Sequence, residues 1–245
     1  MLELDQITSL IIEPTAYCNL HCPQCPRFDA EGFLTANLTP AHLNADQLAK
    51  NLNLDQLPQL KEVKLEGDYG DIMMHPFPTK FISMFPNQEI TAVTNGSMRS
   101  TRFWADLADY QNLTVTFSID GLADTNHIYR INSNWGSIID NATAYIDRGG
   151  RAVWKYIVFR HNEHQVEEVK ELGKTMGFFN VLIRKTGRFF NHNTLEELES
   201  AFSKSFDDNE NIDPTFKNFT NRVLSLYSLR SVSVRSWNLP KRHRS

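Results

Sequence analysis

The stretch from Leu10 to Cys25, LIIEPTAYCNLHCPQC, decides the fold. It begins with an apolar run typical of a buried β-strand, which we expect over residues 9–13, and it continues into a loop that holds all three cysteines of the chain. In parallel α/β proteins, the loops after the C-terminal ends of the strands carry the chemistry. The stretch therefore predicts the first strand of such a sheet, with a thiol-rich site directly after it.

The three cysteines, Cys18, Cys22 and Cys25, have the spacing C-x3-C-x2-C. A disulfide would leave one of them unpaired. A structural zinc site needs four ligands, and His21 could be the fourth, but this spacing is not among the usual zinc patterns. Three thiolates on a four-iron cluster would leave one iron without a protein ligand and therefore open to substrate or cofactor. We favour the cluster and keep zinc as the alternative.

Outward from this motif, short β-rich runs alternate with longer helical patterns, which is typical of a parallel sheet. The expected strands cover residues 9–13, 62–66, 89–94, 113–119, 152–159 and 180–184. The expected helices cover residues 41–51, 77–84, 101–110, 137–148 and 163–176. Six such units predict an α/β fold, an incomplete (β/α)6 TIM-like barrel, because a closed eight-stranded barrel typically needs about 250 residues. An open doubly wound sheet is the competing geometry.

Small and polar residues stand where three further strands end. The second, third and fourth strands run, in that order, into Gly70 with Asp71, Thr94 with Asn95, and Ser118 with Asp120. Taken alone, these are ordinary turn sequences in which the acids could simply cap a helix. Because the ends of parallel strands meet at one edge of a sheet, we expect these residues to lie at the same end as the cysteines.

The cysteine motif and these strand ends resemble the radical S-adenosylmethionine superfamily, in particular its SPASM/Twitch-like subgroup. The resemblance covers about residues 8–186 and departs at Gln24, where the family often has an aromatic residue. It implies one [4Fe–4S] cluster ligated by Cys18, Cys22 and Cys25, with S-adenosylmethionine bound at the open iron. In that family, an electron from the cluster cleaves the cofactor to a 5′-deoxyadenosyl radical, which abstracts a hydrogen from the substrate.

The resemblance also implies which residues contact the cofactor, namely Gly70, Asp71, Thr94, Asn95, Ser118, Asp120 and Arg130. Gly70 would let the backbone approach the cofactor, and Asp71 would accept a hydrogen bond from the methionine amino group. Ser118 and Asp120 would meet the ribose or the methionine portion. Arg130 would pair with the methionine carboxylate or with an anionic substrate. No residue is assigned to the substrate chemistry itself.

Five further residues are candidates for contact with a substrate: His127, His161, Lys155, Arg184 and Lys185. The two histidines stand at loop ends, where capping or surface positions are the more common explanation. The three basic residues would suit a carboxylate or a phosphate if they alternate toward the inside of the barrel.

The chain is expected to divide into a partial-barrel core over residues 1–188 and a C-terminal extension over residues 189–245 with helical and strand-like patterns. We expect the extension to pack on the core or cap it. SPASM and Twitch enzymes usually carry C-terminal cysteines for auxiliary clusters, but no cysteine follows Cys25. The usual auxiliary clusters are therefore not expected in this chain.

Three functions agree with these patterns. The first is a radical enzyme acting on a peptide or protein side chain, and the second is one acting on a nucleotide or small metabolite. The third is a non-catalytic iron–sulfur or zinc protein that binds a partner. For the first two, the resemblance implies a reducing partner such as flavodoxin or ferredoxin.

Charge and hydropathy bear on location and partners. The net charge is −4, but residues 214–245 hold seven Lys and Arg and no acid, so that residues 1–213 carry 18 basic against 29 acidic residues, a net of −11. Such an acidic body would repel a polyanion, so a nucleic-acid partner is not expected.

No apolar run approaches the roughly 18 residues of a membrane span, and the N-terminus lacks the basic and apolar regions of a secretory signal. We expect a cytoplasmic protein with no membrane partner.

Overall fold

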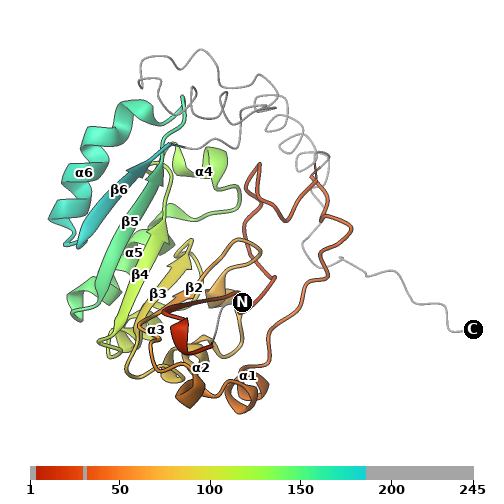
Figure 1. Ribbon diagram of the computed structural model, residues 1–245. Coiled ribbons are helices and arrows are strands. Elements are labelled where there is room, and N and C mark those ends of the chain that lie inside the picture. Colours follow the sequence, from red (N-terminus) through yellow and green to blue (C-terminus); the bar gives the residue numbers. More distant parts are fainter. Residues whose placement is uncertain (1–3, 30–31, 186–245) are drawn as a thin grey trace, which may run out of the picture.

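Six parallel strands form one sheet, with each strand beside its neighbours in sequence (Figure 1). The computed structural model describes residues 4–29 and 32–185, so the predicted extension over residues 189–245 lies outside the described residues. The strands are β1 (Ser9–Ile12), β2 (Glu62–Leu65), β3 (Glu89–Thr94), β4 (Leu113–Ser118), β5 (Arg151–Ile157) and β6 (Asn180–Arg184). All six predicted strands are present, and the predicted ends differ by at most two residues.

The strand order distinguishes the two geometries expected from the sequence. It runs from β1 to β6 without a reversal, whereas a doubly wound sheet reverses its order at a switch point. In the described part of the chain, β1 does not pair with β6, so the sheet stays open. The incomplete barrel is confirmed, and the doubly wound alternative is wrong.

Helices connect the strands. They are α1 (Ala45–Asn51), α2 (Pro78–Ser83), α3 (Thr101–Leu107), α4 (Asn126–Tyr129), α5 (Trp135–Asp147) and α6 (Val166–Thr175), with single 3-10 turns η1 (Leu4–Gln6), η2 (Leu54–Gln56), η3 (Ile72–Met74) and η4 (Glu163–Gln165). None of the described helices is long and apolar enough to cross a membrane. The short helix α4 was not predicted from the sequence.

Polar caps set several helix ends. The side chains of Asn44, Ser100 and Asn134 accept hydrogen bonds from the first turns of α1, α3 and α5. Such caps satisfy backbone N–H groups that have no partner within the helix. The first of these helices was predicted to begin at residue 41 but begins at Ala45, because Asn44 provides the cap. After the C-terminal end of α6, Gly177 has a φ of 85°, the left-handed conformation that glycine commonly adopts after a helix.

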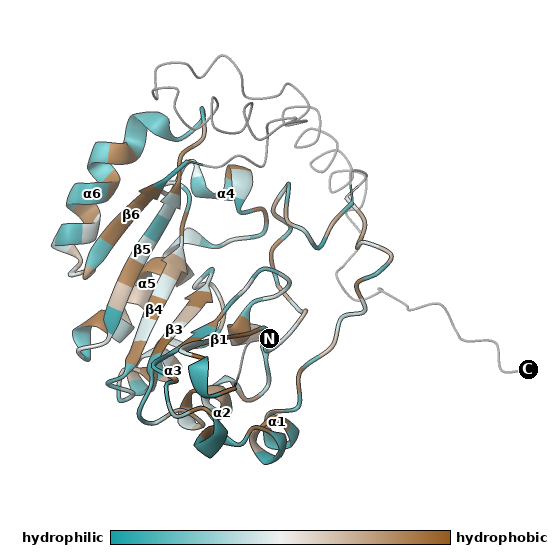
Figure 2. Cartoon of the chain, in the orientation of Figure 1, coloured by the Kyte–Doolittle hydropathy of each residue, from teal (hydrophilic) through white to brown (hydrophobic). Residues whose placement is uncertain are grey.

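The core lies between the sheet and the helices that cover one of its faces. Trp104 of α3 and Tyr145 of α5 pack with Phe117 of β4, and all three are fully buried. Figure 2 shows apolar colour along the strands, and mixed polar and apolar colour around α6. On β1, Ile11 points the other way and is 68% exposed. The helices therefore cover one face, and the strand ends are left free to form a pocket.

Candidate functional site

The loop after β1 brings the three cysteine thiols to one pocket. Within this loop, the N–H of Cys25 donates to the carbonyl of Cys22 (3.3 Å), and Gln24 between them has a left-handed φ of 59°. This conformation is uncommon for a residue other than glycine. The tight turn brings Cys22 and Cys25 to the same side of the loop. Gln24, the position that departs from the family pattern, thus shapes the cysteine loop through its backbone.

The pocket opens to solvent, and its cavity volume is about 90 Å³. Besides the three cysteines, its lining includes nearly all of the predicted cofactor-binding residues, namely Gly70, Asp71, Thr94, Asn95, Ser118 and Arg130. They come from the ends of β2, β3 and β4 and from the loop after α4. Asp120 is the exception, because it is fully buried and does not line the pocket.

Gly70 serves the packing of the cysteine loop. A Cβ at this position would lie 2.0 Å from the carbonyl oxygen of Thr15 and 2.9 Å from that of Tyr17, which no side chain can tolerate. The missing side chain therefore allows the loop after β2 to approach the loop after β1. Gly70 also lines the pocket, and its predicted role, close approach of the backbone to a cofactor, stays a prediction.

Asp71 links the loop after β2 to the end of β3. Its buried carboxylate accepts hydrogen bonds from the hydroxyl of Thr94 (2.9 Å), the backbone N–H of Asn95 (2.7 Å) and the backbone N–H of Met73 (2.9 Å). Burial raises the pKa of Asp71, while these hydrogen bonds favour the charged form. The acid caps η3, as the simpler interpretation of the sequence suggested, and it also lines the pocket.

Amide groups surround Cys18. The backbone N–H of Leu20 lies 3.4 Å from the sulfur of Cys18, and the side-chain amide of Asn95 lies 3.8 Å from it. The same amide donates to the side-chain oxygen of Asn19 (2.9 Å), and the amide of Asn19 donates to the hydroxyl of Ser97 (2.8 Å). The end of β3 is thus tied to the cysteine loop, and its N–H groups favour a thiolate at Cys18.

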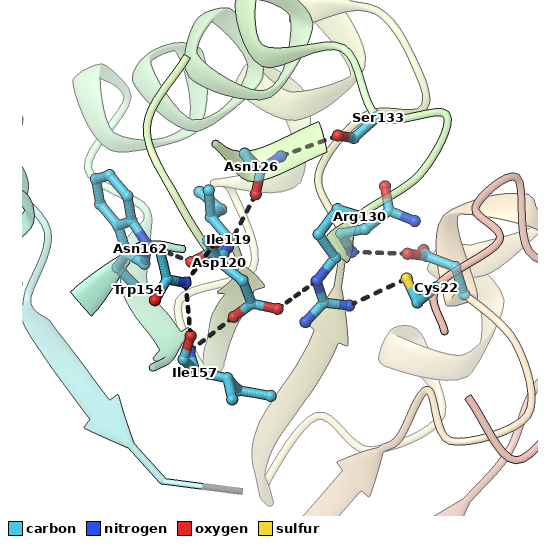
Figure 3. A network of polar contacts seen from close by, with 11 residues as sticks. Cys22, Ile119, Asp120, Asn126, Arg130, Ser133, Trp154, Ile157 and Asn162 are labelled. Carbon is cyan, nitrogen blue, oxygen red and sulfur yellow. Dashed lines mark hydrogen bonds and ion pairs between the residues drawn. The ribbon is translucent and has the colours of Figure 1, made fainter. Parts of the chain in front are cut away.

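A second polar network leads from the protein interior to Cys22 (Figure 3). The Nε of Arg130 lies 2.6 Å from the carboxylate of Asp120, and its Nη1 lies 3.9 Å from the sulfur of Cys22. The other carboxylate oxygen of Asp120 accepts from the backbone N–H of Ile157 (2.7 Å). Both carboxylate oxygens of Asp120 are therefore bound within the protein, and the residue positions Arg130. Its contact with the ribose or the methionine portion of the cofactor stays a prediction.

Two asparagines fix this network in place. The amide of Asn162 donates to the carbonyls of Asp120 (2.8 Å) and Ile157 (2.9 Å), and the side-chain oxygen of Asn126 accepts from the N–H of Asp120 (2.9 Å). Both asparagines are almost fully buried. Neither was predicted from the sequence, because an asparagine gives no sign there of its distant partners.

Burial controls the ionisation of two of the thiols. It raises the pKa of Cys18 to about 12, and it raises that of Cys22 to about 11 even though Arg130 acts in the opposite direction. Metal ligation requires thiolates, so loading must release protons and should become more favourable as the pH rises.

We therefore expect Cys18 and Cys22 of the metal-free protein to react with iodoacetamide at pH 8 at least about tenfold more slowly than in the urea-unfolded chain. Mass spectrometry of alkylated peptides against time would measure this. Equal rates in the folded and unfolded proteins would contradict the burial of these thiols.

The other candidate residues lie outside the pocket lining. Burial, and then the neighbouring His127 and His164, lower the pKa of His161 to about 4. Lys155 pairs in register with Ser118, so both side chains lie on the pocket side of the sheet, in agreement with the predicted alternation. Arg184 pairs in register with Ile157, another pocket-lining residue, and lies on that side too.

The arrangement of the thiols bears on the choice between zinc and a cluster. Among residues 4–29 and 32–185, no three His, Cys, Asp or Glu side chains come close enough together to hold a single metal ion. Tetrahedral zinc, with Zn–S bonds of about 2.3 Å, would require such convergence. In a four-iron cluster each thiolate binds a different iron, so the sulfurs need only face one cavity. The three thiols that line one pocket are a donor set that fits such a cluster.

Arg27 is among the pocket-lining residues that were not predicted from the sequence. Arg27, two residues after Cys25, is 6% exposed, and its Nε is buried without a hydrogen-bond partner. The sequence places an arginine near the cysteines but cannot show that its Nε is buried without a hydrogen-bond partner.

Comparisons with known proteins identify the fold. No protein-family model matches the chain, and no curated protein matches it. Among solved structures, Streptococcus suis SuiB bound to S-adenosylmethionine is similar over 93% of this chain and 49% of its own, with 15% identity and a TM-score of 0.62. The structure of anSMEcpe with bound AdoMet is similar over 91% of this chain and 61% of its own, with 14% identity and a TM-score of 0.58.

Methylornithine synthase, PylB, is similar over 74% of this chain and 54% of its own, with 12% identity and a TM-score of 0.51. The chain spans about half the length of the SuiB structures. These neighbours are radical S-adenosylmethionine enzymes. The chain has the partial-barrel fold of the radical S-adenosylmethionine enzymes.

Proposed function

We propose that this chain is a radical S-adenosylmethionine enzyme of the SPASM/Twitch-like type. One observation carries the proposal: the structure brings the three thiols of the C-x3-C-x2-C loop into one pocket with residues from the ends of β2, β3 and β4. In this proposal Cys18, Cys22 and Cys25 ligate one [4Fe–4S] cluster. The residues at the strand ends then hold S-adenosylmethionine beside it.

The bound cluster would supply an electron for reductive cleavage of S-adenosylmethionine to methionine and a 5′-deoxyadenosyl radical. The protein holds the site in shape around it. Asp71, Thr94 and Asn95 form a buried hydrogen-bonded wall, and Asp120 holds Arg130 against Cys22. Tyr129 and Ile157 add apolar surface to the lining, which limits the access of water to a reactive site.

For the substrate we propose a peptide or protein side chain. The support comes from the similar structures: SuiB is also seen bound to its precursor peptide SuiA, and anSMEcpe is also seen bound to the Cp18Cys peptide. The likeness to methylornithine synthase supports the alternative of a nucleotide or small metabolite, and Lys155, on the same side of the sheet as Ser118, would suit an anionic group on it. Flavodoxin or ferredoxin is the proposed electron donor.

The test uses protein purified and reconstituted without oxygen. It should hold about four irons and four sulfides per chain, and with dithionite it should convert S-adenosylmethionine into 5′-deoxyadenosine, slowly even without substrate. Chromatography with mass spectrometry measures the product. The Cys18→Ala, Cys22→Ala and Cys25→Ala variants should lose the cluster and the product.

Stoichiometric zinc with no iron in the anaerobic protein would contradict the proposal. Bound cluster without 5′-deoxyadenosine under any reductant would instead favour a non-catalytic iron–sulfur protein. If cleavage occurs, comparing peptides and metabolites of cells that express the wild type with those of cells that express Cys22→Ala would distinguish the two substrate classes.

A further inference from the structure

One edge of the sheet is open at β1. Figure 2 shows β1 and β6 at opposite edges, and among the strands that the structure describes β1 pairs only with β2. The carbonyl of Ile12 faces β2, where it accepts from the N–H of Glu66 (3.0 Å). Because backbone groups alternate along a strand, the N–H and C=O groups of Ser9 and Ile11 point away from β2. Such a free edge is a template for a further strand.

The middle of this edge is apolar. Ile11 is 68% exposed, whereas Leu10 and Ile12 on either side of it point to the other face and pack in the hydrophobic core. The strand Ser9–Ile12 contains neither the charged residues nor the prolines with which natural proteins block an edge strand. A strand added here, with an apolar residue opposite Ile11, would bury both side chains.

Acidic side chains lie on the same face of the sheet as Ile11. Ser9 pairs in register with Glu62, and Glu62 pairs in register with Glu89, so both acids share the side to which Ser9 and Ile11 point. Lys64 lies 3.4 Å from the carboxylate of Glu62, which leaves the charge of Glu89 unmatched by this lysine.

Further acids follow the ends of β1 and β2. One carboxylate oxygen of Glu13 is buried and has no hydrogen-bond partner within the described residues. Burial raises the pKa of Glu13, and the negative charges of Asp68 and Glu66 act in the same direction. The edge at β1 is therefore apolar in its middle and bordered by negative charge.

The C-terminal extension contains a segment that matches this edge in pattern and in charge. Residues 230–236, RSVSVRS, lie outside the described residues, but their sequence alternates like that of a strand. Val232 and Val234 are β-branched, which favours strands, and Arg230 falls on the same side by the period of two. The segment belongs to residues 214–245, which hold seven Lys and Arg and no acid, so its charge complements the acids around β1.

The length of the chain permits this return to β1. The structure describes the chain up to Lys185, just after β6, and the 44 residues from 186 to 229 could span up to about 150 Å when extended. Six strands about 4.8 Å apart make a sheet only about 24 Å wide. A second copy of the chain, pairing through its own β1, would instead bring the same acids together, and like charges repel.

We propose that residues 231–235 of this chain join the sheet as a strand along the free edge of β1. Val232 and Val234 then cover Ile11, and Arg230 lies beside the acids of the same face. The added strand completes the wall of the partial barrel from which the cysteine loop emerges. The pairing does not depend on the cluster or on S-adenosylmethionine, so it goes beyond the proposed function.

The test measures hydrogen–deuterium exchange of single amides in the full chain, purified without oxygen, by mass spectrometry with electron-transfer fragmentation. In the wild type, the N–H groups of Ser9 and Ile11 should exchange at least about 100-fold more slowly than in an unfolded chain, because the added strand accepts their hydrogen bonds. Val232→Pro disrupts that strand and should speed both amides at least about tenfold. The N–H groups of Leu10 and Ile12, which point to β2, should change by less than about threefold.

Matched variants separate strand pairing from other effects of the extension. Asn238→Pro places a proline in the same extension but outside the proposed strand, and it should leave the amides of β1 unchanged. Arg230→Glu combined with Arg235→Glu should speed the exposed-edge amides as Val232→Pro does. Lys241→Glu combined with Arg242→Glu changes the charge of the extension by the same amount, and it should have less than about a threefold effect. Circular dichroism of each variant confirms that the core is folded.

Fast exchange of Ser9 and Ile11 in the wild type would overturn the proposal, because the edge would then be open. Protection that survives both Val232→Pro and the double arginine variant would assign the edge to another occupant, and protection that rises with protein concentration would identify a second copy. Equal effects of the two charge variants would show a general attraction without strand pairing. Each of these results contradicts the proposal, and none bears on the cluster, whose iron content and 5′-deoxyadenosine are measured separately.

Discussion

The Asp120→Ala variant should lose about 3–5 kcal/mol of the free energy of unfolding, because it breaks one side of a buried ion pair. Asp120 is completely inaccessible and the side chain of Arg130 is only 16% exposed, so water cannot replace the lost carboxylate. The N–H of Ile157 would also lose its acceptor. Urea denaturation of the metal-free protein, without oxygen, measures the change.

Two control variants test whether this loss of stability comes from the broken ion pair. Asp120→Asn keeps an oxygen for the N–H of Ile157 but turns an amide toward Arg130, so its loss should be smaller than that of Asp120→Ala yet still clear. In the background of Arg130→Met, the same Asp120→Ala change should cost much less, because no unpaired charge remains. A loss below about 1 kcal/mol in the single variant would show that the ion pair is not a structural element of the site.

The Asp71→Ala variant should lose both unfolding free energy and affinity for the cofactor, and the two losses have different causes. The change leaves the N–H groups of Met73 and Asn95 and the hydroxyl of Thr94 without their acceptor in a buried region, which should cost about 2–3 kcal/mol of unfolding free energy. If Asp71 also accepts a hydrogen bond from the amino group of S-adenosylmethionine, cofactor binding should weaken by about 1.5–3 kcal/mol.

The two effects are measured in different states of the protein. Denaturation of the metal-free variant reports stability, and dialysis of the cluster-loaded variant reports affinity for the cofactor. Asp106→Ala is the matched control, because Asp106 is an exposed acid on α3 far along the chain from the cysteine loop, and it should change neither quantity measurably. Unchanged affinity with reduced stability would leave Asp71 with the capping role alone.

The sequence predicted the local elements well because each has a local cause. The alternation of short β-rich runs and helical patterns predicted six strands, and all six are present. The helix ends were less certain, because a single capping side chain such as Asn44 moves the start of a helix by several residues. The short helix α4 has too few residues to produce a recognisable periodic pattern.

The sequence predicted which residues gather at the site, but not the hydrogen bonds and ion pairs between them. Because the ends of parallel strands meet at one edge, the cysteines could be expected beside Thr94 and Ser118, and all of them line the pocket. The pairing of Asp120 with Arg130 was not predicted, since a carboxylate at a strand end looks the same in sequence whether it faces a ligand or a buried arginine.

The sequence by itself determined the parallel barrel, the thiol site after β1 and the residues that gather there, because strand periodicity and cysteine spacing are local properties of the chain. Only the tertiary structure decided which charges are paired. Arg130 finds Asp120 ten residues away and Cys22 more than a hundred residues away, while the buried Nε of Arg27, next to the cysteines, finds no hydrogen-bond partner in the described part of the chain. Pairing depends on burial and on distances between segments remote in sequence, and these exist only once the strands have assembled.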